Sequence, residues 1–123
     1  MTAHPFSEDQ LVEQPAIALL AELGWVALNG SHEVFGPQGT LGRPDTRCAV
    51  LPQRLMTALA RLNPAVPPEA IAAAADEMMR DRSAMPATAA NRELWALLRD
   101  GVAVAMPDPE RGGQKTERLL AVD

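Results

Sequence analysis

Residues 7–23 read SEDQLVEQPAIALLAEL, the first long helical pattern of the chain and the one on which the expected fold depends. Ser7 can accept a hydrogen bond from the first turn, and Gln10 stands at the capping-box position. Pro15 removes one hydrogen bond, which predicts a kink or a helix that begins near Pro15. It also predicts that the backbone of Glu13 departs from ideal helical geometry. Apolar residues recur at helical spacing: Leu11, Val12, Ala16, Ile17, Leu19, Leu20 and Leu23.

The helical pattern ends at Gly24, a typical residue after a helix C-terminus. We expect this helix to be the core element against which the rest of the chain packs. The apolar run Trp25–Leu28 follows directly and predicts a short strand. The segment Asn29–Asp45 is rich in turn-forming residues and predicts a long surface loop. A loop of this length is either functional or stabilised by a neighbour.

Three further helices are predicted. Pro52 opens the first of them, which keeps one apolar face until Asn63-Pro64 stops it. The next runs from Glu69 to about Asp81. The last is capped by Thr88 and continues to Asp100, where Gly101 ends it.

The end of the chain predicts a β-hairpin. Val102–Met106 and Lys115–Asp123 read as its strands, and a turn rich in proline and glycine joins them. An edge strand with an apolar end tends to aggregate unless another strand pairs with it. The fold class expected for residues 1–123 is therefore mixed α+β in a single domain, with about four helices and a small sheet formed by Trp25–Leu28 and the hairpin.

Composition excludes several classes of protein. The formal charge of −5 argues against a free-standing nucleic-acid binder but does not exclude a local basic face. The single cysteine, Cys48, rules out an internal disulfide and a cysteine-rich zinc site, and it reads as a structural thiol. No apolar run is long enough for a membrane span, and the N-terminus lacks signal-peptide features. We therefore expect a cytoplasmic protein.

The individual candidate residues give weak signals. His4 and His32 have no second ligand at helical or turn spacing, so solvent-exposed histidines are the favoured interpretation. Pro44-Asp45 resembles half of a magnesium-nuclease motif, which also needs a carboxylate-x-Lys triplet. The only lysine is Lys115, and the residue two positions before it is Gly113. Pro44-Asp45 is therefore expected to be a turn, and no complete nuclease site is present.

Four arginines cluster around the third and fourth helices and are the candidate DNA contacts: Arg80, Arg82, Arg92 and Arg99. They could form a face that binds phosphate. Acidic residues are interspersed among them, so a solvated surface of mixed charge is the favoured alternative. Direct DNA binding by these arginines would depend steeply on salt concentration.

The order and spacing of several segments resembles the beginning of the restriction (R) subunit of type I restriction–modification enzymes. The segments are VEQPAIALLAELGW (residues 12–25), RLxxALxRLNP (54–64), ANRELWxLLxDGV (90–102) and TERLLAVD (116–123). The resemblance covers nearly the whole chain. None of these segments is itself a catalytic signature.

The resemblance implies an incomplete N-terminal part of a nuclease region of the PD-(D/E)xK type. In that family the enzyme is an ATP-dependent, type I site-specific deoxyribonuclease. It uses Mg²⁺ and ATP, acts on foreign double-stranded DNA and works with methylation and specificity subunits. Glu13 matches a glutamate that approaches the metal site, so its implied role is a supporting catalytic carboxylate and metal ligand. The family's main catalytic triad lies beyond residue 123, so these residues alone are expected to be inactive and to need no cofactor.

A second function class stays open. The chain could be a stand-alone interaction or regulatory module without catalysis, which docks a partner through its apolar final strand or its glycine-rich loop. The reading frame after codon 123 separates these hypotheses. A continuation into a Pro-Asp and carboxylate-x-Lys pattern favours the enzyme, and a natural stop codon favours the module.

Overall fold

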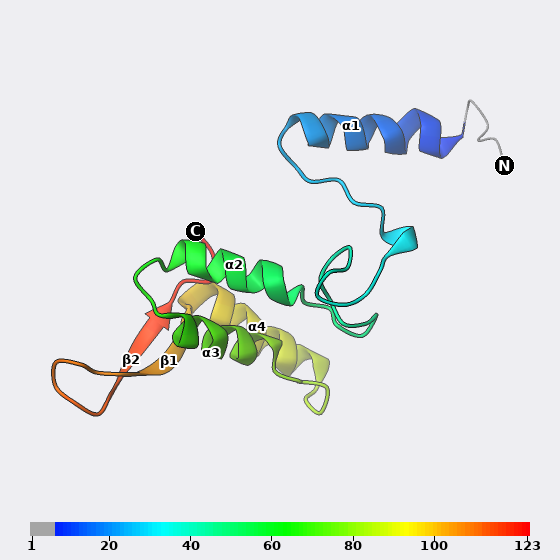
Figure 1. Cartoon of the computed structure of the whole chain (residues 1–123). Helices are drawn as coiled ribbons and strands as arrows, with labels where there is room; N and C mark the ends of the chain where they lie inside the picture. The colour runs from blue at the N-terminus through cyan, green and yellow to red at the C-terminus, as the bar shows by residue number, and fades with distance from the viewer. Residues whose placement is uncertain (1–6) are drawn as a thin grey trace. The chain divides into compact units, whose positions relative to one another are not determined.

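The structure is a computed structural model that describes residues 7–123. These residues form two compact units, divided between Val34 and Phe35 (Figure 1). Residues 7–123 contain four α-helices and a two-stranded antiparallel sheet. The predicted α+β class, with a C-terminal β-hairpin, is therefore confirmed.

The first unit contains a helix that changes its winding at the proline. Asp9–Glu13 is π-helical (η1), and Gln14–Glu22 is α-helical (α1). The N–H of Gln14 donates to the carbonyl of Asp9, five residues back. Pro15 has no N–H and its ring crowds the preceding turn, so a wider turn just before it relieves the clash. The predicted irregular first turn and regular helix from about Pro15 are both present.

Two predictions for this unit are wrong. Glu13 keeps helical dihedral angles, φ −68° and ψ −51°, because the wider turn rather than a distorted residue accommodates the proline. Trp25–Leu28 is not a strand, since no other described segment pairs with it. It runs without regular structure into a single 3-10 turn, Gly30–His32. The predicted long loop after it has no other regular element before Pro52.

The second unit begins its regular structure with three helices: α2 (Pro52–Leu62), α3 (Pro68–Met79) and α4 (Ala87–Asp100). Helices α2 and α3 each have a proline in the first turn, where the missing N–H costs no hydrogen bond. The predicted cap Thr88 is wrong. Helix α4 begins at Ala87, with Pro86 at the N-cap and no side-chain cap, because the fixed geometry of the proline already ends the preceding extended segment.

The hairpin consists of β1 (Val102–Pro107) and β2 (Gln114–Leu119). Val102 pairs with Leu119 and Pro107 with Gln114, in antiparallel register. Strand β2 ends at Leu119, four residues before the predicted end at Asp123. The sheet of the described residues has only these two strands, so the predicted sheet that includes Trp25–Leu28 is not formed.

The hydrophobic core lies entirely in the second unit. It is built from one face of α3, the alternate residues of β1, and one residue each from α2 and β2: Leu59, Ala70, Ile71, Ala74, Ala75, Met78, Val102, Val104, Met106 and Leu119. No described residue of the first unit is buried. The prediction that the first helix is the core element is therefore wrong. The first helix does carry apolar residues at helical spacing. The core forms instead from helices and a hairpin that follow one another in the sequence and bury one another's apolar faces.

One buried polar side chain connects α2 to the end of β2. Asn63 is 9% exposed. Its Nδ2 donates to the carbonyls of Leu59 and Leu120, each at 2.8 Å, and its Oδ1 accepts from the N–H of Leu120 at 2.8 Å. The amide therefore pairs with the backbone of Leu120 as a neighbouring strand would, and it fixes the chain just beyond β2.

Gly101 allows α4 to turn directly into β1. It has φ +87° and ψ 170°, and its N–H donates to the carbonyl of Leu97 at 3.0 Å. Only glycine adopts such a positive φ without strain. A side chain at this position would have its Cβ 2.6 Å from the carbonyl oxygen of Leu119. The close approach of α4 to the end of β2 therefore requires glycine.

Candidate functional site

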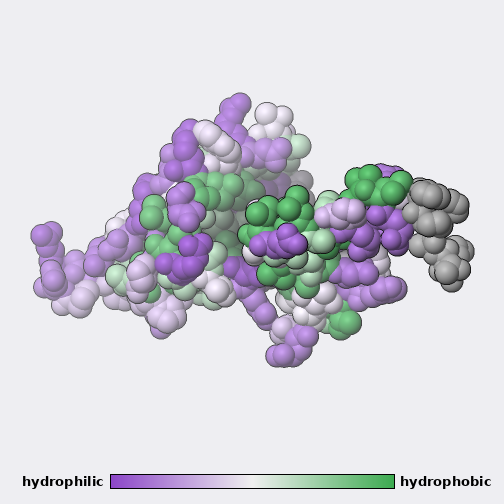
Figure 2. Space-filling view, turned by 90° about the horizontal axis from the view of Figure 1, so that it is seen from above, coloured by the Kyte–Doolittle hydropathy of each residue, from purple (hydrophilic) through white to green (hydrophobic). Residues whose placement is uncertain are grey.

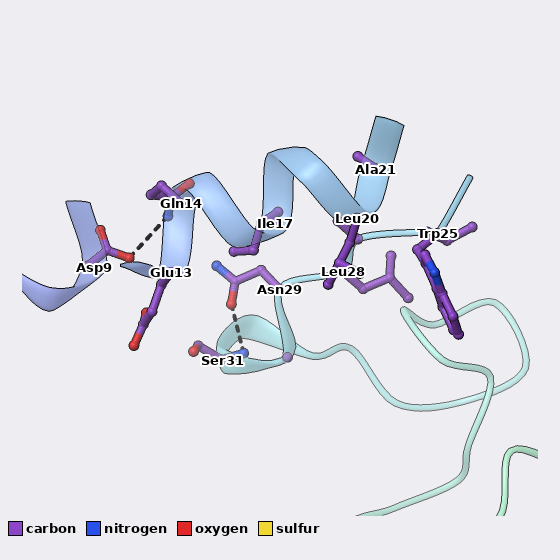
Figure 3. Close-up of a pocket in the computed structure, with 13 residues that line it drawn as sticks. Asp9, Glu13, Gln14, Ile17, Leu20, Ala21, Trp25, Leu28, Asn29 and Ser31 are labelled. Atoms are coloured by element: carbon purple, nitrogen blue, oxygen red, sulfur yellow. Dashed lines mark hydrogen bonds between the residues drawn. The ribbon is translucent and has the colours of Figure 1, made fainter. Parts of the chain in front are cut away.

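Glu13 lies at the polar end of an open trough in the first unit. The trough runs between α1 and the returning segment 25–31, and its volume is about 760 Å³ (Figure 3). Asp9, Asn29 and Ser31 line the same end. Asn29 Oδ1 accepts from the N–H of Ser31 at 2.9 Å, which holds the 3-10 turn. The turn therefore places two polar side chains in the wall that faces the helix (Figure 3).

The two carboxylates at this end differ in their partners. Asp9 Oδ1 accepts a hydrogen bond from Gln14 Nε2 at 3.1 Å. The Glu13 side chain is exposed and has no hydrogen bond or ion pair with any residue in the range 7–123. In Figure 3 its carboxylate points away from the helix axis, on the side of Asn29 and Ser31. Glu13 is thus the carboxylate at this end that has no partner among residues 7–123.

The other end of the trough is apolar. Ile17 and Leu20 continue the line of Asp9 and Glu13 along the helix, because residues three and four apart share a face. Trp25 and Leu28 form the opposite wall, and the N–H of Trp25 donates to the carbonyl of Leu20 at 3.0 Å. Gly24, with φ +95°, makes the sharp turn that places this wall next to the helix. The trough therefore joins an acidic end to a hydrophobic end.

The trough alone does not make a complete metal site. Within the part of the chain that the structure describes, no three His, Cys, Asp or Glu side chains are placed to share a metal ion. Asp9 and Glu13 together offer two carboxylates. Mg²⁺ is commonly held by one or two carboxylates, with water and substrate phosphate oxygens completing six ligands. The metal-ligand role of Glu13 therefore stays a prediction.

Two of the four arginines proposed for DNA contact stabilise the junction of α3 and α4. The side chain of Arg82 is only 9% exposed and donates to the carbonyls of Glu77, Met78 and Arg80 at 2.8–3.1 Å. Its Nε also donates to Glu93 at 3.1 Å. Arg80 pairs with the same Glu93 carboxylate and with Glu77. Arg82 thus satisfies the free carbonyls at the end of α3, as basic residues commonly do.

The other two arginines lie on α4 and are exposed. Arg99 donates two hydrogen bonds to Asp100, at 2.7 and 2.6 Å, and its guanidinium lies 4.4 Å from the centre of the Trp95 ring. Arg92 has no hydrogen bond or ion pair with a residue of the described range. Carboxylates therefore pair with three of the four arginines, which reduces the net positive charge available to phosphate. DNA contact by this group stays a prediction.

The pKa of Asp100 lies below its ordinary value, chiefly because of the hydrogen bonds from Arg99. Replacing Arg99 by glutamine is expected to return the Asp100 pKa towards 3.8, which a titration of the carboxyl carbon by NMR would measure. Because the pKa of Asp100 is lower in the folded protein than in the unfolded chain, any stability from this pair is fully present at neutral pH. This stability is lost as the pH falls from the unfolded pKa through the lower folded pKa. The pair is exposed, so the contribution is small.

Asp81 is the internal control in this titration. Its pKa is also lowered, by a hydrogen bond from the backbone N–H of Ser83 at 2.8 Å. This bond does not involve Arg99, so the pKa of Asp81 should be unchanged in the Arg99→Gln protein. An Asp100 pKa that stays low in this variant would show that Arg99 is not the cause.

The remaining candidates have structural roles. Cys48 is partly buried and its Sγ donates to the carbonyl of Val50 at 2.9 Å. Asp45 accepts from the N–H of Arg47 at 2.8 Å, which confirms Pro44-Asp45 as a turn. His32 is exposed at the end of its 3-10 turn, and His4 lies outside the described residues.

Sequence reasoning singled out Glu13 but missed the residues that surround it. Asp9 stands four positions before Glu13, a spacing that places two side chains on one helical face and could have been recognised. Asn29 and Ser31 reach the site only because Gly24 reverses the chain, and no local sequence pattern gives that direction.

The comparisons with known proteins identify the family. A family model described as the type I restriction enzyme R protein N terminus matches residues 5–123. No curated protein and no solved structure matches the chain. None of the helices in residues 7–123 is long and apolar enough to cross a bilayer. Because the match covers almost the whole chain, this protein belongs to the family of type I restriction enzyme R protein N termini.

Proposed function

We propose that the chain forms the N-terminal part of the nuclease region of an R subunit that cleaves foreign double-stranded DNA. The observation that carries the proposal is the family match over residues 5–123. In this proposal the complete enzyme uses Mg²⁺ for cleavage and ATP for translocation, and it works with methylation and specificity subunits. Glu13 supplies a supporting carboxylate for the magnesium site.

The surroundings of Glu13 support this role. Its carboxylate is exposed and without a protein partner in the described range, while its backbone is fixed by the helical turns on both sides. Carboxylate oxygens are preferred ligands of Mg²⁺. A bound Mg²⁺ supplies positive charge that stabilises the scissile phosphate during attack by water. Asp9, held by Gln14, adds a second negative charge nearby that favours a cation.

The chain of residues 1–123 on its own is expected not to cleave DNA. Two carboxylates without a carboxylate-x-Lys triplet leave too few ligands to fix the ion and the attacking water. The measurement is the conversion of supercoiled plasmid to nicked circles with and without MgCl₂. Magnesium-dependent nicking by highly purified protein would contradict the proposal.

Glu13→Gln is expected to reduce DNA cleavage about 10–100-fold in an R subunit that carries these residues and is assembled with its partner subunits. Glutamine keeps the size and helical preference of glutamate but removes the negative charge. ATP hydrolysis, measured in the same samples, should be unchanged because Glu13 acts only on the cleavage step. Equal losses of both activities would indicate a structural role instead.

Glu22→Gln is the matched control for charge. Glu22 is the last residue of α1, the helix that follows Glu13 directly, and it is exposed and does not line the trough. Its replacement removes the same negative charge at the opposite end of α1. Cleavage by Glu22→Gln should therefore equal that of the unchanged protein, and a loss as large as that of Glu13→Gln would rule out a specific role for Glu13.

A further inference from the structure

All of the net charge of the protein belongs to the first unit. Residues 7–34 contain five carboxylates and no lysine or arginine: Glu8, Asp9, Glu13, Glu22 and Glu33. The second unit holds the remaining 11 carboxylates and all 11 basic residues, so its formal charge is zero. The first unit therefore presents an almost purely negative field to any molecule that approaches it.

The same unit exposes an unusual number of large apolar side chains. Trp25 is 68% exposed and Leu20 is 47% exposed, and no described residue of the unit is buried. Figure 2 shows hydrophobic side chains at the surface beside hydrophilic ones. The exposed apolar residues of the unit are Leu11, Val12, Ile17, Leu19, Leu20, Leu23, Trp25, Val26, Leu28 and Val34. Contiguous exposed apolar groups with a polar rim are typical of protein–protein interaction surfaces.

These two properties meet in the trough of Figure 3. Asp9 and Glu13 stand at one end, while Ile17, Leu20, Trp25 and Leu28 form the walls of the other. The volume of about 760 Å³ lies within the range of protein binding sites, but the walls remain largely exposed. An open trough of this kind suits a segment laid along it rather than a small molecule enclosed within it.

We propose that the trough docks a segment of a partner protein whose apolar side chains are flanked by lysine or arginine. The apolar side chains would lie against Leu20 and Trp25, and the basic side chains would reach the carboxylates at the other end. Burial of apolar surface would supply most of the affinity, and the opposite charges would fix the direction of the segment. This goes beyond the proposed function, since it needs neither Mg²⁺ nor DNA.

Charge decides between the possible occupants. A second copy of the first unit would place its five carboxylates against the five carboxylates of the first copy, and these like charges would repel one another. Without Mg²⁺, a nucleic acid would bring phosphates to the same carboxylates, and no basic side chain in residues 7–34 would neutralise the phosphates. A basic, amphipathic protein segment satisfies both the charge and the apolar walls.

The test uses tryptophan fluorescence of the full chain. Trp95→Phe removes the other tryptophan and leaves Trp25, on the trough wall, as the only reporter. The probes are a synthetic amphipathic peptide of leucine and lysine, and the same peptide with glutamate in place of every lysine. With EDTA present, the lysine peptide should shift Trp25 emission to the blue and bind at least about tenfold more tightly than the glutamate peptide. Equal affinities would overturn the proposal.

Adjacent leucines provide the matched control for position. Leu20 lines the trough, whereas Leu19 is similarly exposed and does not. Leu20→Gln should weaken binding of the lysine peptide about tenfold, and Leu19→Gln should leave it unchanged. Equal effects of the two substitutions would show non-specific attraction and overturn the proposal. Sedimentation equilibrium of the free chain should give a monomer, and self-association abolished by Leu20→Gln would instead assign the trough to a second copy.

Discussion

Gly101→Ala is expected to destabilise the second unit by about 3 kcal/mol. The substitution places a Cβ on a residue with φ +87° and ψ 170°, a conformation that costs an L-residue about 1–3 kcal/mol. The same Cβ would lie 2.6 Å from the carbonyl oxygen of Leu119. Backbone cannot rotate away as a flexible side chain can, so α4 and the end of β2 must separate and the core around Val102 loosens. Urea unfolding followed by circular dichroism would measure the loss.

Gly112→Ala separates the two causes. Gly112 has φ +74°, close to that of Gly101, but a Cβ there would meet nothing within 4 Å. This variant should therefore show only the cost of the positive φ, about 1–2 kcal/mol. If both variants lost the same stability, the contact with Leu119 would have no energetic importance.

Asn63→Ala is expected to destabilise the second unit by about 2–3 kcal/mol. The substitution removes three hydrogen bonds of 2.8 Å and leaves the N–H and carbonyl of Leu120 without their partner. Each such bond contributes about 1 kcal/mol, and a partly buried group left unpaired costs more. The backbone amide of Leu120 should also exchange its hydrogen faster, which NMR can follow at that single residue.

Two further variants test the assignment to Asn63. Asn91→Ala changes the same residue type at an exposed position of α4 and should be neutral or slightly stabilising, because alanine favours helices. Asn63→Asp keeps the acceptor for the N–H of Leu120, but it loses both donated bonds and places a buried carboxylate oxygen against the carbonyls of Leu59 and Leu120, so it should be at least as unstable as Asn63→Ala. A fully stable Asn63→Ala protein would contradict the proposed pairing.

The helices of the second unit could be predicted because their signals are local. Pro52 and Pro68 fix helix starts, and Gly101 fixes a helix end, through the conformational limits of single residues. The observed bounds Pro52–Leu62 and Ala87–Asp100 lie close to the predicted ones. The hairpin was also predictable, since its two strands are separated by one short turn.

Features that depend on distant partners could not be predicted. Trp25–Leu28 has the composition of a strand, but a strand forms only when another segment offers its hydrogen bonds. The apolar stripe of α1 has helical spacing, yet spacing does not tell whether a surface is covered within the chain or left open to a partner. The roles of Asn63 and Arg82 follow from carbonyl groups that only the folded backbone places within reach.

The candidate site was predicted in part. Glu13 came from the family resemblance and not from its own chemistry, because a single glutamate on a helix is ordinarily solvated. The four-residue spacing of Asp9 and Glu13 can be read from the sequence, but the wall opposite them required the reversal at Gly24. Its role as a metal ligand stays a prediction that Glu13→Gln tests.

The pairing of Asn63 with Leu120 also implies a delay during synthesis, between the moment Asn63 is made and the moment its partner is made. The two residues are 57 positions apart, and at about 5–20 residues per second the ribosome needs about 3–11 s to make that length of chain. During this interval α2 and α3 can meet, while the apolar face that Leu119 will cover stays open. The nascent chain would therefore expose this surface to chaperones for seconds, and it becomes closed only when its last strand arrives.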